Sequence, residues 1–217
     1  ILSLAILVFL FLILTIPRSS NLIRSSMYLT DTSIHRKASL IKRSDWILML
    51  GMVVIAVLIR AYHLDALPPY TDEYIHLNTA KLLISGSPIN TVYQRGMYIV
   101  TLPVAFFFKV FGLGVFQARI VGVIINSLAI VPLYLLMRKI NKPTAILSAL
   151  LYATNPWVIA IARNVREYAF YPFYFYWIIY LIVINLESFP RRIHKSLFSK
   201  THIKWLVTFI LLSFPIV

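Results

Sequence analysis

The sequence predicts an all-α membrane protein, a polytopic bundle of transmembrane helices with interfacial helices in a long first outer loop. Hydrophobic residues make up 60% of the chain and the mean hydropathy is +0.82, well above the range of soluble domains. Apolar runs long enough to cross a bilayer recur along the chain, and clusters of Lys and Arg separate them. The absence of cysteine excludes disulfides, thiolate catalysis and cysteine-zinc sites.

The apolar runs place the candidate membrane helices. We expect spans at residues 1–16, 46–64, 118–137, 143–161 and 171–186, with another starting near Trp205. Three basic loops, 17–44, 138–142 and 187–204, lie between them, and positively charged loops favour the cytoplasmic side. The net charge of +14 therefore reflects membrane topology, and we expect no nucleic-acid partner.

The short apolar run 98–112 is the ambiguous element. Span 46–64 leaves the cytoplasm and span 118–137 must return to it, so 98–112 cannot also cross the membrane. We therefore expect this run to lie in the outer interface or to dip into it. Two outer loops follow from this topology, a long one at about 65–117 and a short one at about 162–170.

The chain begins with Ile1 and stops at Val217 inside an apolar run, which suggests a piece of a longer protein. Residues 1–16 have no basic leading segment or small-residue cleavage site, so they resemble a span more than a signal peptide. We expect two parts: 1–44, an amino-terminal span and basic cytoplasmic loop, and 45–217, a transmembrane core truncated at its carboxyl end.

Within the long outer loop, Thr71–Ser85 reads as an amphipathic helix along the membrane surface. Thr71 is the expected N-cap and Gly86 the expected stop. Its apolar contacts are expected from Ile75, Leu82, Leu83 and Ile84. Asp72 and Glu73 begin this helix, in a chain with only seven acidic residues. Carboxylates at the membrane surface indicate a functional site. The alternative is that they only complement the dipole at the start of the helix, and both can be true.

The short outer loop carries Arg163, Arg166 and Glu167, which share one face if the loop is helical. Two arginines at a membrane surface suit a phosphate or pyrophosphate, which they can bind bidentately. The alternative is a surface ion pair between Arg163 and Glu167, worth little. The acidic pair on the same side of the membrane favours the functional interpretation.

A metal site is the weaker hypothesis. His76 is three residues beyond Glu73, but one histidine with two carboxylates is a poor metal signature, so we expect a solvated interfacial histidine. No cofactor is certain, and a divalent metal is left open. The aromatic residues after Tyr168 are typical of an interfacial belt.

Several short motifs together resemble a known family. Arg60-x-Tyr62-x-Leu64 followed by Asp72-Glu73, and Phe111-Gly112 followed by Ala118-Arg119, resemble the C-class glycosyltransferases with many membrane spans. The closest branch is the protein O-mannosyltransferase and lipid A aminoarabinose transferase group. The resemblance covers most of residues 46–186, and no single motif is long. It implies transfer of a sugar from a polyprenyl-phosphate carrier on the outer side of the membrane.

The resemblance also implies roles for individual residues. Asp72 matches the acidic residue proposed as catalytic, with Glu73 beside it. Arg95 falls where relatives have a basic residue near the carrier phosphate, although Gly96-Met97 stands where a proline pair is usual. Arg166-Glu167-Tyr168-Ala169 matches the Arg-x-Tyr-Ala stretch of the second outer loop. Tyr171 stands where the aminoarabinose enzymes have an Asp, a departure that speaks against that branch and leaves the broader family intact.

The mechanism implied is an inverting transfer in which Asp72 is the general base for an acceptor hydroxyl. Arg95, Arg163 and Arg166 would stabilise the charge on the leaving carrier phosphate. The acceptor is a protein, a lipid or a glycan, and membrane lipid surrounds the protein. The plasma membrane is expected for a prokaryotic source, which we favour, and the endoplasmic reticulum for a eukaryotic one. The alternative is a lipid-carrier binding or transport protein without catalysis, which would be expected to place charges near the midplane.

Overall fold

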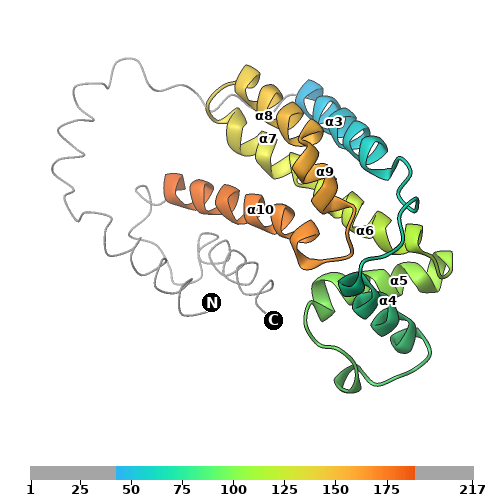
Figure 1. Ribbon diagram of the computed structural model, residues 1–217. Coiled ribbons are helices and arrows are strands. Elements are labelled where there is room, and N and C mark those ends of the chain that lie inside the picture. The colour runs from blue at the N-terminus through green and yellow to red at the C-terminus, as the bar shows by residue number, and fades with distance from the viewer. Residues whose placement is uncertain (1–42, 189–217) are drawn as a thin grey trace, which may run out of the picture. The chain divides into compact units, whose positions relative to one another are not determined.

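The computed structural model describes residues 43–188, with side chains as far as residue 184 (Figure 1). The spans expected at 1–16 and near Trp205 lie outside the described residues. The described chain consists of helices and turns, which confirms the predicted all-α fold. The helices are α3 Arg43–Ala61, α4 Thr71–Ile84, α5 Leu102–Phe111, α6 Val115–Leu128, α7 Ile130–Arg138, α8 Lys142–Thr154, α9 Pro156–Ala162 and α10 Glu167–Ser188. A 3₁₀ turn, Ile89–Thr91, and a π-helical turn, Met97–Thr101, precede α5.

The helices long and apolar enough to cross a membrane agree with the expected spans. In the described residues they are Arg43–Ala61, Val115–Arg138, which joins α6 and α7, and Glu167–Ile184. The pair α8–α9 counts as a fourth if it is one broken span. Met97–Phe111 is a shorter apolar helix, as expected for the ambiguous run. The chain is thus an integral membrane protein, and which side its loops face stays a prediction.

Helices α8 and α9 are bent by 58° relative to each other at Asn155. Pro156 cannot continue the hydrogen-bond pattern of α8, and the Asn155 side chain instead accepts hydrogen bonds from the amides of Trp157 and Val158. The break frees carbonyl groups at the end of α8. The fully buried Arg60 of α3 donates to the carbonyls of Tyr152 and Ala153, each at 3.1 Å, and so links α3 to the bend.

Two apolar clusters hold the bundle together. The first joins α3, α7 and α8 and includes Met49, Leu133 and Ala149. The second joins α4, α5, α6 and the first turns of α10 and includes Val100 and Phe108. Figure 1 shows α3, α7 and α8 running side by side, with α4 and α5 gathered near the end of α3. The second cluster therefore attaches α4 and α5 to the bundle.

Helix α4 forms where expected, but its N-cap is Tyr70, not Thr71. Its buried apolar residues are Leu77 and Ala80, and Leu83 packs against the same cluster, as expected. The other expected contact residues, Ile75, Leu82 and Ile84, are more than a third exposed. The stop at Gly86 is confirmed: φ is +95° there, and the amides of Gly86 and Ser87 close back on the carbonyls of Leu83 and Leu82.

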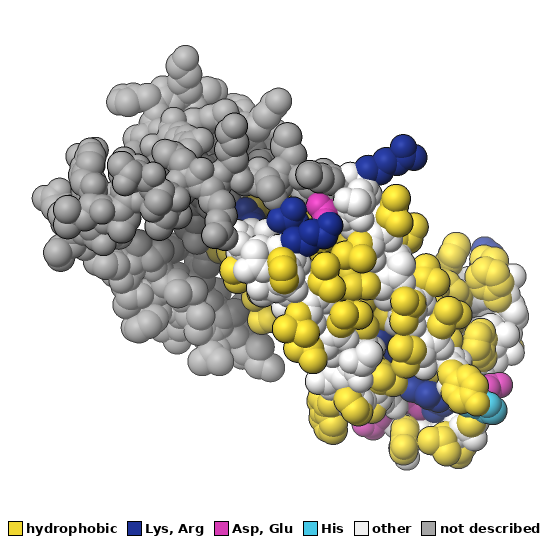
Figure 2. Space-filling model, turned by 90° about the horizontal axis from the view of Figure 1, so that it is seen from above, with side chains coloured by type: hydrophobic (Ala, Val, Ile, Leu, Met, Phe, Trp, Pro, Cys, Tyr) yellow, Lys and Arg dark blue, Asp and Glu magenta, His cyan; other side chains and the backbone are white. Residues whose placement is uncertain are grey.

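A buried carboxylate ties the helices together at the other end of the bundle. Asp45 in the first turn of α3 is fully buried and accepts a hydrogen bond from the Tyr134 hydroxyl at 3.1 Å. Its oxygens also lie 3.3 Å from Lys142 Nζ and 3.7 Å from Arg138 Nε. Figure 2 shows hydrophobic side chains over the flank of the bundle, with charged side chains gathered in separate groups. The charged groups thus mark two ends with an apolar belt between them.

The two ends are expected on opposite sides of the membrane. Because the natural chain has no cysteine, Ser85→Cys after α4 and Lys139→Cys after α7 each create a single thiol at an exposed position. A membrane-impermeant maleimide should label one variant on sealed vesicles and the other only on inverted ones. Labelling of both variants from the same side would contradict this topology.

Candidate active site

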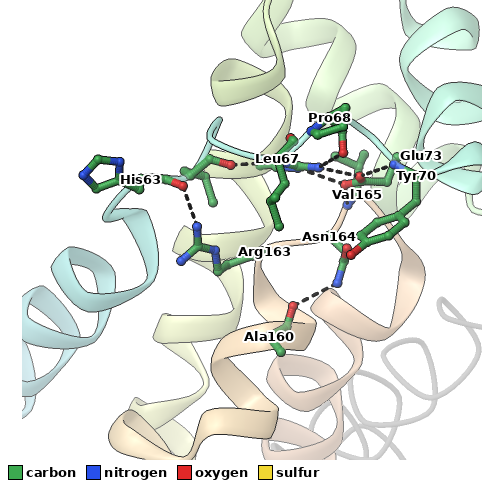
Figure 3. Close-up of polar contacts among 11 residues, drawn as sticks. His63, Leu67, Pro68, Tyr70, Glu73, Ala160, Arg163, Asn164 and Val165 are labelled. Carbon is green, nitrogen blue, oxygen red and sulfur yellow. Dashed lines mark hydrogen bonds and ion pairs between the residues drawn. The ribbon is translucent and has the colours of Figure 1, made fainter.

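The carboxylate of Glu73 is the best-connected acidic group at the α4 end of the bundle (Figure 3). Its side chain is 1% exposed. Oε1 accepts from Arg119 Nε at 3.1 Å and from the Val165 amide at 2.8 Å. Oε2 accepts from Arg119 Nη2 at 2.7 Å and from the Tyr70 amide at 3.0 Å. Glu73 thus joins the start of α4 to α6 and to the loop before α10.

Arg119 uses its whole guanidinium fork in this contact. Besides the two bonds to Glu73, Nη1 donates to the carbonyls of Leu64 and Leu67 at 2.9 Å, and Nη2 to that of Pro68 at 3.3 Å. These carbonyls belong to the segment that leads from α3 to α4. Arg119 therefore binds both the segment between α3 and α4 and the start of α4 itself. A lysine could not reproduce these contacts, because its ammonium group is a single charge with three donors and lacks the planar fork.

The pKa of Glu73 lies below its ordinary value. Burial alone would raise this pKa, but the hydrogen bonds from Arg119, Val165 and Tyr70 together outweigh it. Glu73 is consequently an anion throughout the physiological pH range, and its four acceptor interactions occupy both oxygens. The geometry of Glu73 therefore suits a residue that holds the neighbouring segments in position.

Asp72, the neighbouring residue, has the opposite environment. Its side chain is 62% exposed, and Oδ2 lies 2.9 Å from Arg166 Nη1. Arg166 itself is 17% exposed and lies above the ring of Tyr168, with the guanidinium carbon 5.8 Å from the ring centroid. The structure therefore brings together Asp72, Arg166 and Tyr168, which the sequence analysis selected from two separate loops.

Glu167 connects the remaining selected residues. Its carboxylate is nearly buried, with Oε1 3.2 Å from Arg95 Nε and Oε2 3.6 Å from Arg166 Nε. Gly96 makes room for it: φ is +65°, and a Cβ atom there would lie 3.0 Å from Glu167 Cγ and Oε1. Gly96 therefore provides both the left-handed backbone and the space that the Arg95–Glu167 ion pair requires.

Two predictions about this region are wrong. Residues 163–166 form turns between α9 and α10, so Arg163 does not share a helical face with Arg166 and Glu167. Arg163 instead donates from Nη2 to the His63 carbonyl at 2.6 Å (Figure 3). The alternative of an Arg163–Glu167 ion pair fails as well, because the partners of Glu167 are other residues. Arg163 thus lies outside the charged cluster, which consists of Asp72, Arg95, Arg166 and Glu167.

The prediction that His76 is a solvated interfacial histidine is also wrong. Its side chain is 1% exposed, and Nδ1 lies 3.0 Å from the Thr101 hydroxyl oxygen. Burial lowers the pKa of His76, and the opposing attraction of Glu167 is smaller, so the net pKa is below the ordinary value. The neutral imidazole therefore predominates at neutral pH.

An apolar groove of about 690 Å³ begins beside the charged cluster. Tyr168 and Tyr171, in the first turns of α10, line it together with Leu133, Ser148 and Leu151 in the middle of α7 and α8. Asn155, at the bend between α8 and α9, lines it too. The groove therefore extends from the charged end of the bundle toward the belt of apolar side chains.

Metal-binding chemistry has little support in this part of the chain. Among residues 43–184, no group of three or more His, Cys, Asp or Glu side chains could hold an ion. The carboxylates of the cluster are instead close to arginines. The arrangement can bind an anion and present a carboxylate, and the adjacent groove can accept an apolar chain.

The comparisons with known proteins give one family. The chain matches the dolichyl-phosphate-mannose-protein mannosyltransferase family over residues 98–212, more than half of its length. The chain belongs to this family. Neither the curated proteins nor the solved structures give a match.

Membership confirms the resemblance seen in the short motifs and makes the chain a membrane protein of a glycosyltransferase family. The matched region includes Arg119, the groove and the loop with Arg166, but begins after α4. Asp72 and Glu73 therefore lie outside it. Arg119 is a site residue that the sequence motifs did not single out. The signal that could have identified it is a single charged residue within a long apolar run.

The Glu73–Arg119 pair should dominate local stability. Glu73→Gln removes the charge but keeps the shape, and leaves Arg119 buried and uncompensated, which costs about 3–5 kcal/mol. Thermal unfolding of the purified protein in detergent should show a marked fall in midpoint. Asp72→Asn is the matched control, because its exposed ion pair is worth little. Equal midpoints for wild type and Glu73→Gln would contradict this role.

Acid should destabilise the wild type through the same group. Because the folded-state pKa of Glu73 is lowered, its contribution is present above the ordinary carboxyl range and is lost as the pH falls through the folded-state pKa. Glu73→Gln should lack this part of the pH dependence of unfolding.

Proposed function

We propose that the protein transfers a sugar from a polyprenyl-phosphate carrier to an acceptor hydroxyl on the outer side of the membrane. The observation that carries this proposal is the meeting of three features at Tyr168: an exposed carboxylate, an arginine and an apolar groove. An amphiphile with an anionic head and a long apolar tail fits such a junction. Family membership supports the class of reaction.

The charged cluster suits the head of this donor. Arg166 is held by Asp72 through Nη1, and its buried Nε faces Glu167 Oε2 at 3.6 Å. The donor phosphate would contact the terminal amino groups of Arg166, whose side chain is 17% exposed. Arg95 is 69% exposed and pairs with Glu167 through Nε, which leaves its terminal amino groups for the same phosphate. Arg163 lies farther away and has a structural hydrogen bond, so we assign it no direct contact with the donor.

Asp72 is the proposed general base. As the acceptor oxygen bonds to the anomeric carbon, its proton passes to the Asp72 carboxylate and the bond from the anomeric carbon to the phosphate oxygen breaks. The electron pair of that bond leaves on the carrier phosphate, where the arginines stabilise it. Attack opposite the leaving group inverts the anomeric centre. Glu73, although adjacent, is a positioning residue in this scheme because both of its oxygens are occupied.

A carrier-binding or transport protein without catalysis is the second candidate, because the groove and the arginines alone would serve it. What favours transfer is the position of Asp72. A carboxylate beside the anion site weakens the binding of an anionic ligand, so an exposed Asp72 suits a general base better than a simple binding protein. The acceptor, whether a protein, a lipid or a glycan, would approach from the exposed side of Asp72.

Asp72→Asn should lower sugar transfer from a polyprenyl-phosphate sugar by at least about a hundredfold, the usual contribution of a general base. Carrier binding should persist or tighten, because a negative charge is lost. Asp65→Asn, at an exposed position before α4, is the matched control and should transfer normally. Normal turnover by Asp72→Asn would exclude it as the base, and binding without turnover by wild type would favour the transport candidate.

The groove makes the affinity depend on the carrier tail. Ser148→Trp places a large ring in the groove and should weaken binding of a long-chain carrier by at least about tenfold, since two buried methylene groups are worth that much. A carrier with a short tail should be affected less. Leu147→Trp, on the exposed side of α8, is the control. Equal effects on both tail lengths would place the tail elsewhere.

A further inference from the structure

The buried histidine of α4 has no part in the reaction described above, yet it lies directly behind the charged cluster. His76 Nε2 is 4.0 Å from Glu167 Oε1, and Nδ1 is 3.0 Å from Thr101 Oγ1. Glu167 Oε1 is also the atom that pairs with Arg95. Thr101, His76, Glu167 and Arg95 thus form a chain of polar groups from the buried π-helical turn to the exposed arginine.

The chemistry of the two neighbours selects the tautomer. A carboxylate oxygen can only accept a hydrogen bond, whereas a threonine hydroxyl can donate one. The favourable arrangement has the proton on Nε2, facing Glu167, and the lone pair of Nδ1 accepting from the Thr101 hydroxyl. The other tautomer would direct a lone pair at the carboxylate and is disfavoured.

We propose that neutral His76 is a positioning residue that holds Glu167, and through it Arg95, in place for the donor phosphate. Glu167 Oε1 makes no hydrogen bond in the described part of the chain, so its position depends on the ion pair with Arg95 and on the nearby imidazole. Gly96 lies against both groups, because a Cβ atom there would be 3.0 Å from Glu167 Oε1 and 3.2 Å from His76 Cε1. The inference rests on the proposed function, because it assigns the arginine to the donor of that reaction.

Protonation of His76 would disturb this arrangement. An imidazolium has no lone pair for Thr101 and attracts the Glu167 oxygen that Arg95 uses. The charged groups that act on it are Glu167 of α10, Arg166 of the preceding loop, Arg95, and Asp72 of α4, while the ring of Tyr93 packs edge-on at 5.7 Å. Since the pKa of His76 is below its ordinary 6.5, the effect is expected only as the pH falls below that value.

The test measures binding of dolichyl-phosphate mannose to the full chain in detergent micelles. This ligand is a phosphodiester with constant charge over the relevant pH range. His76→Phe keeps an aromatic ring but lacks both nitrogens, and should weaken binding by about tenfold, because Glu167 loses the polar Nε2 neighbour that lies 4.0 Å from Oε1. His76→Gln retains an amide donor toward Glu167 and should bind nearly as wild type. Arg95→Gln should weaken binding similarly, and His76→Phe should add nothing to it.

The pH dependence gives a second readout that a purely structural role would not change. Wild-type affinity should fall on acidification below pH 6.5, and His76→Gln should lack this fall. In turnover, His76→Phe should raise KM for the donor and change kcat little. Should His76→Phe not fold, the comparison of wild type with His76→Gln still decides the question.

Any of three results would overturn the inference. His76→Phe could bind as wild type does, or the double variant with Arg95→Gln could lose affinity by the product of the two single effects. Finally, wild type and His76→Gln could show the same loss of affinity on acidification. If Arg95→Gln weakens binding and the His76 variants do not, the proposed function survives without the histidine. If the wild type binds no lipid-linked sugar, both proposals fall together.

Discussion

The buried ion pair of Glu73 and Arg119 is the interaction on which the arrangement of the site depends. It connects the first turn of α4, the segment from α3, the start of α6 and the loop before α10 in one set of hydrogen bonds. Burial of two charges is costly, so such a pair persists only when every acceptor and donor is satisfied. Here the guanidinium fork and the carboxylate both meet this condition. The ion pair therefore also fixes the positions of the neighbouring residues Asp72 and Arg166.

Asp72 and Glu73 are adjacent in sequence and have opposite environments. The rotation of about 100° between consecutive helical residues is enough to bury the second carboxylate against α6 and leave the first in water beside Arg166. The buried carboxylate therefore holds the backbone, and the exposed one is the group to which the proposed reaction assigns the proton. On the same helix, His76 and Leu77 face inward, so α4 joins the apolar cluster, the ion pair and the charged site at once.

Hydropathy and the spacing of basic loops predict the helices correctly, because burial in lipid dictates long apolar runs. The run 98–112 forms the short apolar helix Met97–Phe111, and its place in the outer interface stays a prediction. The long-range contacts are another matter. Glu73 and Arg119 are 46 residues apart, and no local pattern distinguishes a carboxylate paired across that distance from one at a helix start. The burial of His76 follows from the packing of α4 on the turn before α5, which is a tertiary property.

The misplacement of Arg163 has a local cause that the sequence only hints at. Three- and four-residue spacing suggests a shared helical face, but the chain leaves the helical conformation after Ala162 and re-enters it at Glu167. In between, the Asn164 side chain donates to the Ala160 carbonyl, closing the end of α9. An asparagine near a helix end was available as a signal. The assignment of Arg166 survives because it depends on Asp72 and not on Arg163.

The most direct test of the central claim measures how widely the position of α4 varies relative to α8. Spin labels at Lys81→Cys on α4 and Leu147→Cys on α8 occupy exposed positions, and the chain has no other cysteine. With the Glu73–Arg119 pair intact, the distance between the labels should show one narrow distribution. Arg119→Lys, which cannot reproduce the fork, should broaden it. An equally narrow distribution in Arg119→Lys would show that α4 is held without the ion pair and would contradict the account.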